Sequence, residues 1–156
     1  MSSNKAPQLK VNSVLSLFSN RQFSDAIDAI DLLKIDYPKD ELLLNINGAC
    51  YAGLGQFDAA IELYEEALLI NPNYAKVYFN LGGAYHELSQ LDEAVINYKK
   101  SLDIDPSFAE AQNNLGNVYR ELDQLDKAID SYQKALVINP KYAEAHYSVA
   151  ITFQLL

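Results

Sequence analysis

The sequence predicts an all-α fold, an array of helical hairpins, and three observations predict it. Four prolines recur at intervals of 34 residues: Pro38, Pro72, Pro106 and Pro140. Small and aromatic residues recur in step with them, and no segment shows the alternating pattern of a strand. A fixed period of this size is typical of stacked supersecondary units, each of which buries its apolar face only against its neighbours.

Residues that occupy the same place in successive units form what we call a column. The small column holds Gly48, Gly82, Gly116 and Ala150, and two aromatic columns hold Tyr51, Tyr85, Tyr119 and Phe153, and Tyr64, Tyr98 and Tyr132. Gly inside a helix costs roughly 0.5–1 kcal/mol relative to Ala, so it needs a compensating contact. We expect Gly82 to lie against Ala94 of the second helix in its unit. Tyr85 and Tyr98 would then fill the gaps beside this contact.

Local signals place two helices in each unit. One column precedes an apolar periodic run and is interpreted as the N-cap of the second helix: Ser24, Asp58, Asp92 and Asp126. The column three residues upstream is predicted to adopt a left-handed backbone: Arg21, Gly55, Ser89 and Asp123. The second helix should end at the residue before each proline, which is pushed out of the α region: Tyr37, Asn71, Asp105 and Asn139. About nine helices of roughly 12 to 14 residues result.

The repeat divides one predicted domain, 1–156, into units 7–40, 41–74, 75–108 and 109–142, followed by the first helix of an incomplete unit, 143–156. Six residues match the tetratricopeptide repeat pattern at its spacing, and the chain resembles that family most clearly over 41–142: Leu81, Gly82, Tyr85, Ala94, Tyr98 and Pro106. The first unit departs from the pattern at Lys10, Val14 and Leu17, and we interpret it as a degenerate N-terminal cap. The resemblance implies a right-handed superhelix of four hairpins plus one helix.

Composition and charge exclude several classes of function. The 12 basic residues face 21 acidic ones, for a net charge of −9, which argues against a nucleic-acid partner. No run of about 18 apolar residues could cross a membrane, and the first residues are polar, so we expect a cytoplasmic protein. The single Cys50 excludes an internal disulfide and is expected to be a small buried hydrophobe rather than a reactive thiol.

Neither catalysis nor cofactor binding is indicated. The two histidines, His86 and His146, are sixty residues apart and have no Cys or carboxylate at ligand spacing, so no metal site is predicted. Glu65 and Glu66 point in different directions around a helix and suit a solvated face better than an acid/base pair. No phosphate-binding loop or nucleophile motif appears, so we predict that the chain is not an enzyme and binds no cofactor.

The resemblance implies a concave groove, lined by the first helices, that receives an extended peptide or a partner helix. The candidate groove residues are Asn12, Asn45, Lys76, Phe79, Asn80, His86, Asn113, Asn114, Asn117, Arg120, Tyr147 and Ser148. One column, two residues before the small column, reads Asn12, Ile46, Asn80, Asn114 and Ser148. Amides one repeat apart can bond both the C=O and the N–H of an extended backbone. This column resembles the asparagine ladder of the O-linked N-acetylglucosamine transferase repeats; the alternative is that Asn80 and Asn114 bond only their own helices or water.

Some tetratricopeptide co-chaperones hold the C-terminus of a heat-shock protein through a two-carboxylate clamp, and this chain lacks it. Other residues stand in the clamp columns beside Asn80: Asn45, Ala49, Glu110 and Asn114. Because Glu110 stands where a cation is needed, it would repel a terminal carboxylate. We therefore predict that the chain does not bind such a tail.

The last segment predicts an open apolar face: Val149, Ile151, Phe153, Leu155 and Leu156. Either the chain is part of a longer array or this face packs against a second copy. A second class of function follows from the first alternative, because the segment from Gly53 to Phe57 and the units after it resemble arrays that precede bacterial sulfotransferases and glycosyltransferases. In that case the chain would recruit substrates or partners for a larger enzyme. The identity of the partner does not follow from the sequence.

Overall fold

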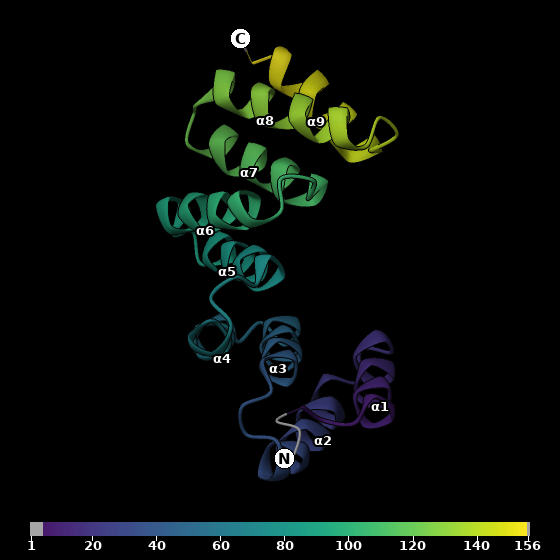
Figure 1. Cartoon of the computed structure of the whole chain (residues 1–156). Helices are drawn as coiled ribbons and strands as arrows, with labels where there is room; N and C mark the ends of the chain where they lie inside the picture. The colour runs from purple at the N-terminus through teal and green to yellow at the C-terminus, as the bar shows by residue number, and fades with distance from the viewer. Residues whose placement is uncertain (1–4, 156) are drawn as a thin grey trace. The chain divides into compact units, whose positions relative to one another are not determined.

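The computed structural model describes residues 5–155, and within them every regular element is an α-helix (Figure 1). The chain divides into two compact parts, each larger than one repeat. From here on, "first unit" means the part that runs to Asn73, and "second unit" means the part that begins at Tyr74. The first unit contains α1 (Gln8–Ser19), α2 (Phe23–Asp36), α3 (Glu41–Gly53) and α4 (Phe57–Ile70). The second contains α5 (Ala75–Glu87), α6 (Leu91–Ile104), α7 (Ala109–Glu121), α8 (Leu125–Ile138) and α9 (Ala143–Phe153).

The predicted all-α array of hairpins is confirmed. In the described part of the chain there are nine helices of 11 to 14 residues, and helices that follow one another pack as the pairs α1/α2, α3/α4, α5/α6 and α7/α8. In the first unit α3 also packs against α2, and in the second α7 packs against α6 and α9 against α8. Within each unit, a hairpin therefore buries its apolar face partly against the next helices, as the period predicted.

The left-handed turn inside each hairpin is confirmed at every predicted position. The φ angles are 60° at Arg21, 74° at Gly55, 57° at Ser89 and 57° at Asp123. The N–H of the next residue donates to the carbonyl five positions back, as from Gln90 to Tyr85 at 2.9 Å, which is the bond that closes a Schellman turn. One residue later the second helix begins, so the hairpin turn is short and the two helices are antiparallel neighbours.

The predicted N-caps of the second helices are wrong by two positions. The N-cap residues are Gln22, Gln56, Gln90 and Gln124, and none of them makes a side-chain capping bond. The left-handed turn fixes where the helix starts, so Ser24, Asp58, Asp92 and Asp126 lie in its first turn. There the three carboxylates are placed favourably toward the positive end of the helix dipole.

The second helices end where the prolines predicted. Their C-cap residues, Tyr37, Asn71, Asp105 and Asn139, have φ angles between −127° and −130° and ψ angles of 58° to 92°. Three of these residues also accept a hydrogen bond from the N–H two positions on, at 3.0 to 3.3 Å. A short Asx turn therefore connects each of these three helices to the next repeat.

The space left by the small column is filled by a tyrosine ring, which corrects the expected contact between Gly82 and Ala94. A Cβ built on Gly82 would lie 2.7 Å from Cδ1 of Tyr98, and one on Gly116 would lie 2.5 Å from Cε1 of Tyr132. In both pairs the tyrosine is buried. Glycine is needed because a ring, and not another backbone, occupies the place of its side chain.

The first hairpin solves the same packing problem with different residues. Val14 stands in the small column and Ile30 in the tyrosine column, and both are buried in the core of the first unit. In the later hairpins a large tyrosine of the second helix fills the space beside a glycine of the first helix. In the first hairpin two side chains of medium size, one from each helix, fill it instead. This difference in packing explains why residues 7–40 depart from the repeat pattern.

Candidate functional site

The first helices of the second unit lie side by side, because α7 contacts both α5 and α9. Most of the predicted groove residues lie on these three helices: Lys76, Phe79, Asn80 and His86 on α5, Asn113, Asn114, Asn117 and Arg120 on α7, and Tyr147 and Ser148 on α9. The two others belong to the first unit, Asn12 on α1 and Asn45 on α3. The second unit by itself therefore offers the larger part of the candidate site.

Two asparagines of the ladder column, Asn80 on α5 and Asn114 on α7, are half-buried and interact with other residues of the chain. Asn114 Nδ2 lies 3.5 Å from the hydroxyl oxygen of Tyr98, which is on α6. Burial raises the pKa of Tyr98 to about 12, so its hydroxyl stays protonated. Asn80 also interacts with other residues of the chain. The contact with Tyr98 orients the amide of Asn114, whose carbonyl oxygen can act as an acceptor.

A second amide on α7 is positioned in the same way. The hydroxyl of Tyr132, on α8, donates to Asn117 Oδ1 at 2.8 Å. Burial raises the pKa of Tyr132, although the nearby Arg120 opposes the shift. Asn114 and Asn117 thus belong to one arrangement, in which a buried tyrosine of a second helix supports an asparagine of a first helix.

Three predicted groove residues are buried instead of lining an open surface: Asn45, Asn113 and Ser148. Asn113 is fully buried, and its Nδ2 donates to Glu144 Oε1 on α9 at 3.0 Å, while its Oδ1 has no partner. Asn45 in the first unit is 8% exposed. The sequence could not separate these positions from the exposed ones, because both kinds carry asparagine. Asn113 serves the contact between α7 and α9 rather than the surface.

An aromatic cluster lies at the start of α5 and α7. The centroids of Phe79 and Phe108 are 4.6 Å apart, and the ammonium of Lys76 lies 4.7 Å from the first ring and 5.2 Å from the second. A cation over aromatic faces is favourable, especially where the site is partly dry. Phe108 was not predicted as a site residue. Its signal was available, because Tyr74 and Tyr142 hold the same column.

The remaining predicted residues of the second unit differ in their exposure. His86 Nε2 lies 2.7 Å from Glu121 Oε1, so this pair joins α5 to α7. Tyr147 is 67% exposed, whereas Ser148 is buried. The acidic side chain that argues against a carboxylate clamp, Glu110, is exposed in the first turn of α7.

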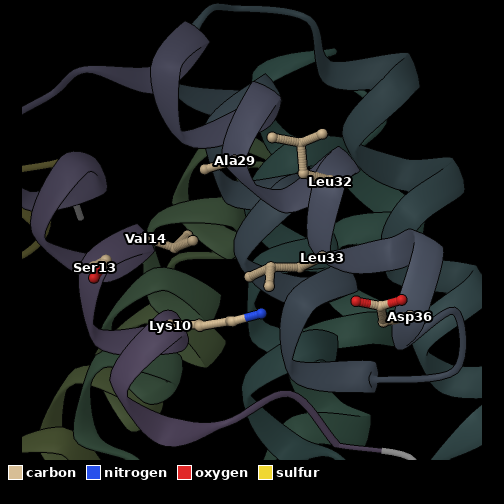
Figure 2. A pocket seen from close by; sticks show the side chains of 7 residues that line it. All are labelled: Lys10, Ser13, Val14, Ala29, Leu32, Leu33 and Asp36. Carbon is tan, nitrogen blue, oxygen red and sulfur yellow. The ribbon is translucent and has the colours of Figure 1, made fainter.

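The first unit presents a different surface. Asn12 is exposed and accepts from Gln8 Nε2 at 2.8 Å, while the next ladder residue, Ile46, is buried. A hollow of about 290 Å³ lies between α1 and α2 (Figure 2). Its lining is mostly apolar: Lys10, Ser13, Val14, Ala29, Leu32, Leu33 and Asp36. The ladder therefore does not continue in a regular way on the helices of this unit.

Cys50 is a fully buried thiol, as predicted. Burial raises its pKa to about 11, so it is protonated at neutral pH. No group of three or more His, Cys, Asp and Glu side chains in residues 5–155 is arranged to hold a metal ion. Among the same residues, no helix has the length and apolar character needed to cross a bilayer.

The open apolar face expected near the end of the chain is present in part. Phe153 is 55% exposed and Leu155 is 58% exposed. Val149 and Ile151 are half-buried, because α9 packs against α8. Leu156 lies outside the described residues.

Comparison with known proteins identifies the repeat. Family models described as tetratricopeptide repeat match residues 40–107 and 97–130, and one described as TPR repeat matches residues 116–156. A peroxisomal targeting signal receptor of Kluyveromyces lactis is 28% identical over 75 residues, which are 48% of this chain and 13% of the receptor. The chain thus spans only a small part of that relative.

Two solved structures show the same fold. MamA from Desulfovibrio magneticus RS-1, from residue 41 to its end, superimposes with a TM-score of 0.84 at 21% identity, over 95% of this chain and 84% of that one. The first tetratricopeptide domain of Spaghetti (RPAP3), bound to the HSP90 peptide SRMEEVD, superimposes with a TM-score of 0.72 at 23% identity, over 74% of this chain and 91% of that one. The three family models together therefore show that residues 40–156 contain tetratricopeptide repeats.

Proposed function

We propose that this chain is a non-catalytic, cytoplasmic protein-interaction scaffold that holds an extended peptide or a partner helix along the first helices of its second unit. The observation that carries the proposal is the pair of oriented asparagine amides on α7, next to Asn80 on α5. Asn114 and Asn117 are each supported by the hydroxyl of a buried tyrosine. The peptide bound to the similar RPAP3 domain is consistent with this use of the fold.

The amides would act on the backbone of the ligand rather than on its side chains. A carboxamide carries one acceptor and two donors, so Asn80 and Asn114 can each pair with a peptide group of an extended chain. The resemblance to the asparagine ladder of O-linked N-acetylglucosamine transferase repeats motivates this part of the proposal. Binding of this kind tolerates many sequences, because every peptide backbone presents the same groups.

The aromatic cluster would give the groove its preference for particular side chains. Phe79 and Phe108 form a half-buried shelf at one end of α5 and α7, beside the exposed Lys76. An apolar side chain of the ligand could pack on such rings, since aromatic residues dominate the energetics of many interfaces. We expect a ligand that places an apolar side chain at this end. We do not expect the ligand to need a free C-terminal carboxylate, because the exposed Glu110, two residues after Phe108, would repel it.

A pull-down followed by affinity measurement tests the ladder. The partner recovered by the wild-type chain is titrated against the double variant Asn80→Ala and Asn114→Ala. We expect more than tenfold weaker binding with a nearly unchanged melting temperature, because both side chains are only half-buried. The matched control is Asn20→Ala, an exposed asparagine at the end of α1. Equal affinity of the double variant and the wild type would show that neither asparagine contributes to partner binding.

The clamp prediction has its own test with the peptide SRMEEVD, which is bound by the RPAP3 domain. We expect no binding that depends on the free terminal carboxylate, because Glu110 occupies a position where that mode needs a cation. The amidated peptide is the control. A clear preference for the free acid over the amide would contradict the prediction.

We also propose that the exposed apolar residues of α9 and its C-terminal side contact a second copy of the chain. Tyr147, Phe153 and Leu155 are each more than half exposed. Light scattering at several concentrations should show association that the change of Phe153 and Leu155 to Ser abolishes. Val137→Ser, at an 82% exposed position on α8, is the control. A concentration-independent monomer would refute self-association.

A further inference from the structure

A pocket lies on the opposite side of α7 from Asn114 and Asn117. It has a volume of about 480 Å³ and is bounded by α6 and α8, with α7 packed between these two helices (Figure 1). Its lining consists of Lys99, Leu102, Asp103, Gln112, Leu115, Tyr119, Lys127, Asp130, Ser131 and Lys134. On α7 the lining residues are spaced as one face of a helix, and Asn114 and Asn117 are not among them.

The pocket exists where one repeat lacks an aromatic residue that the preceding repeat has. Tyr78 and Gln112 are separated by one period of 34 residues and so hold the same column. Around Tyr78, the ammonium of Lys100 lies 5.5 Å from the ring centroid. Lys134 holds the column of Lys100 in the next repeat, but Gln112 offers it no ring. The later repeat thus keeps the lysine, Lys134, but has no aromatic residue at the position of Tyr78.

The pocket carries a small positive excess on an acidic chain. Three of the 12 basic residues line it together with two aspartates, Asp103 and Asp130, whereas the net charge of the chain is −9. Lys134 is paired with Asp130 at 2.6 Å. Within residues 5–155, neither Lys99 nor Lys127 has a carboxylate at ion-pair distance. Their ammonium groups lie 6.0 and 5.5 Å from the ring centroid of Tyr119.

We propose that this pocket binds a peptide segment in which an aromatic side chain is flanked by acidic residues. The ring would enter beside Gln112, in the place that Tyr78 fills one repeat earlier, and would lie against Leu102 and Leu115. The flanking carboxylates would pair with Lys99 and Lys127. The site is independent of the proposed groove, because it uses the second helices and another face of α7.

The probe is the unlabelled peptide acetyl-Glu-Tyr-Glu-Glu-amide, whose binding to the full chain is followed by isothermal titration calorimetry. Its amidated end removes any terminal carboxylate. The matched peptides replace Tyr by Ala, or each Glu by Lys. We expect the parent peptide to bind at least tenfold more tightly than either, and more weakly as salt rises. Equal affinity for the Ala peptide would overturn the aromatic part of the proposal, and equal affinity for the Lys peptide would overturn the acidic part.

Two variants test the pocket in different ways. Gln112→Tyr copies Tyr78 of the preceding repeat and should fill the space, lowering affinity about tenfold or more without altering charge. The control is Gln133→Tyr, at an exposed position on α8 that does not line the pocket. Unchanged affinity in a folded Gln112→Tyr variant would place the ligand elsewhere and overturn the proposal.

Charge is tested with the double variant Lys99→Gln and Lys127→Gln, for which we expect about tenfold weaker binding. Its control removes two exposed lysines outside the pocket, Lys39→Gln and Lys141→Gln. If both double variants lose the same affinity, the loss comes from the change in net charge and not from the pocket, which would contradict the proposal. Circular dichroism of every variant confirms that it is folded.

Two further measurements distinguish this pocket from the groove and from a nucleic-acid site. The variant Asn80→Ala and Asn114→Ala should bind the probe as well as wild type does; a parallel loss would place the peptide in the groove and overturn the second site while leaving the groove proposal standing. A labelled single-stranded oligonucleotide should bind more weakly than the peptide. Tighter binding of the oligonucleotide, lost in the lysine variant, would assign the pocket to a phosphate backbone instead.

Discussion

Replacing Gly82 by Ala tests the packing rule on which each hairpin depends. The added Cβ would lie 2.7 Å from Cδ1 and 2.8 Å from Cε1 of Tyr98, closer than nonbonded carbon atoms approach. The ring is buried, so it cannot move aside without disturbing its neighbours. The neighbouring Gly83 provides the control, because a Cβ there would lie 3.7 Å from the Tyr98 hydroxyl oxygen, an ordinary contact.

The two substitutions share one energy term and differ in the other. Each replaces Gly by Ala inside α5, which favours the helix by about 1 kcal/mol. Only Gly82→Ala adds an overpacking cost, typically about 1–3 kcal/mol. We therefore expect Gly83→Ala to raise the free energy of unfolding, and Gly82→Ala to lie at least about 1 kcal/mol below it. The difference between the variants isolates the contact with Tyr98.

Urea denaturation followed by circular dichroism measures both values. A third variant combines Gly82→Val with Tyr98→Ile and so reproduces the pair Val14 and Ile30 of the first hairpin. It should recover part of the stability that Gly82→Ala loses, since the volume is redistributed rather than added. If Gly82→Ala and Gly83→Ala are equally stabilised, the ring does not require glycine and the packing rule is wrong.

Three further predictions concern the first unit. Asn47→Leu should stabilise the protein by about 1–2 kcal/mol in urea denaturation, because the Oδ1 of Asn47 is buried without a hydrogen-bond partner. Leucine fits this position, since Leu81 stands at the same position of the next repeat. A destabilised variant would contradict this reasoning. Asp40→Ala should cost about 1–2 kcal/mol, since the carboxylate caps α3, whereas Asp40→Asn should cost less in the same assay. Because burial raises the pKa of Cys50 from 9.0 to about 11, its contribution to stability is complete below about pH 9 and lost as the pH rises through 11. Cys50→Ala, which copies Ala84, should flatten the fall in stability over that range, and an unchanged slope would contradict this origin.

The candidate site could be predicted only in outline. The columns placed Asn114 and Asn117 on the same helix, but not the tyrosine hydroxyls that support them. Asn113 was grouped with these residues, although it is buried against α9. The pocket at Gln112 was not predicted at all. Each of these facts depends on which side chains of different helices meet, and a column of identical residue types does not contain that information.

The sequence by itself determined the number of helices in residues 5–155, the positions of the turns and the ends of the second helices. These features are local: the residue before proline leaves the α region for steric reasons, and the left-handed position follows from the chemistry of one column. The start of the second helix was misjudged because the turn before it, and not a capping side chain, sets the first residue. Only the tertiary structure decided that Tyr98 and not Ala94 fills the space at Gly82, because packing depends on distances between atoms of separate helices.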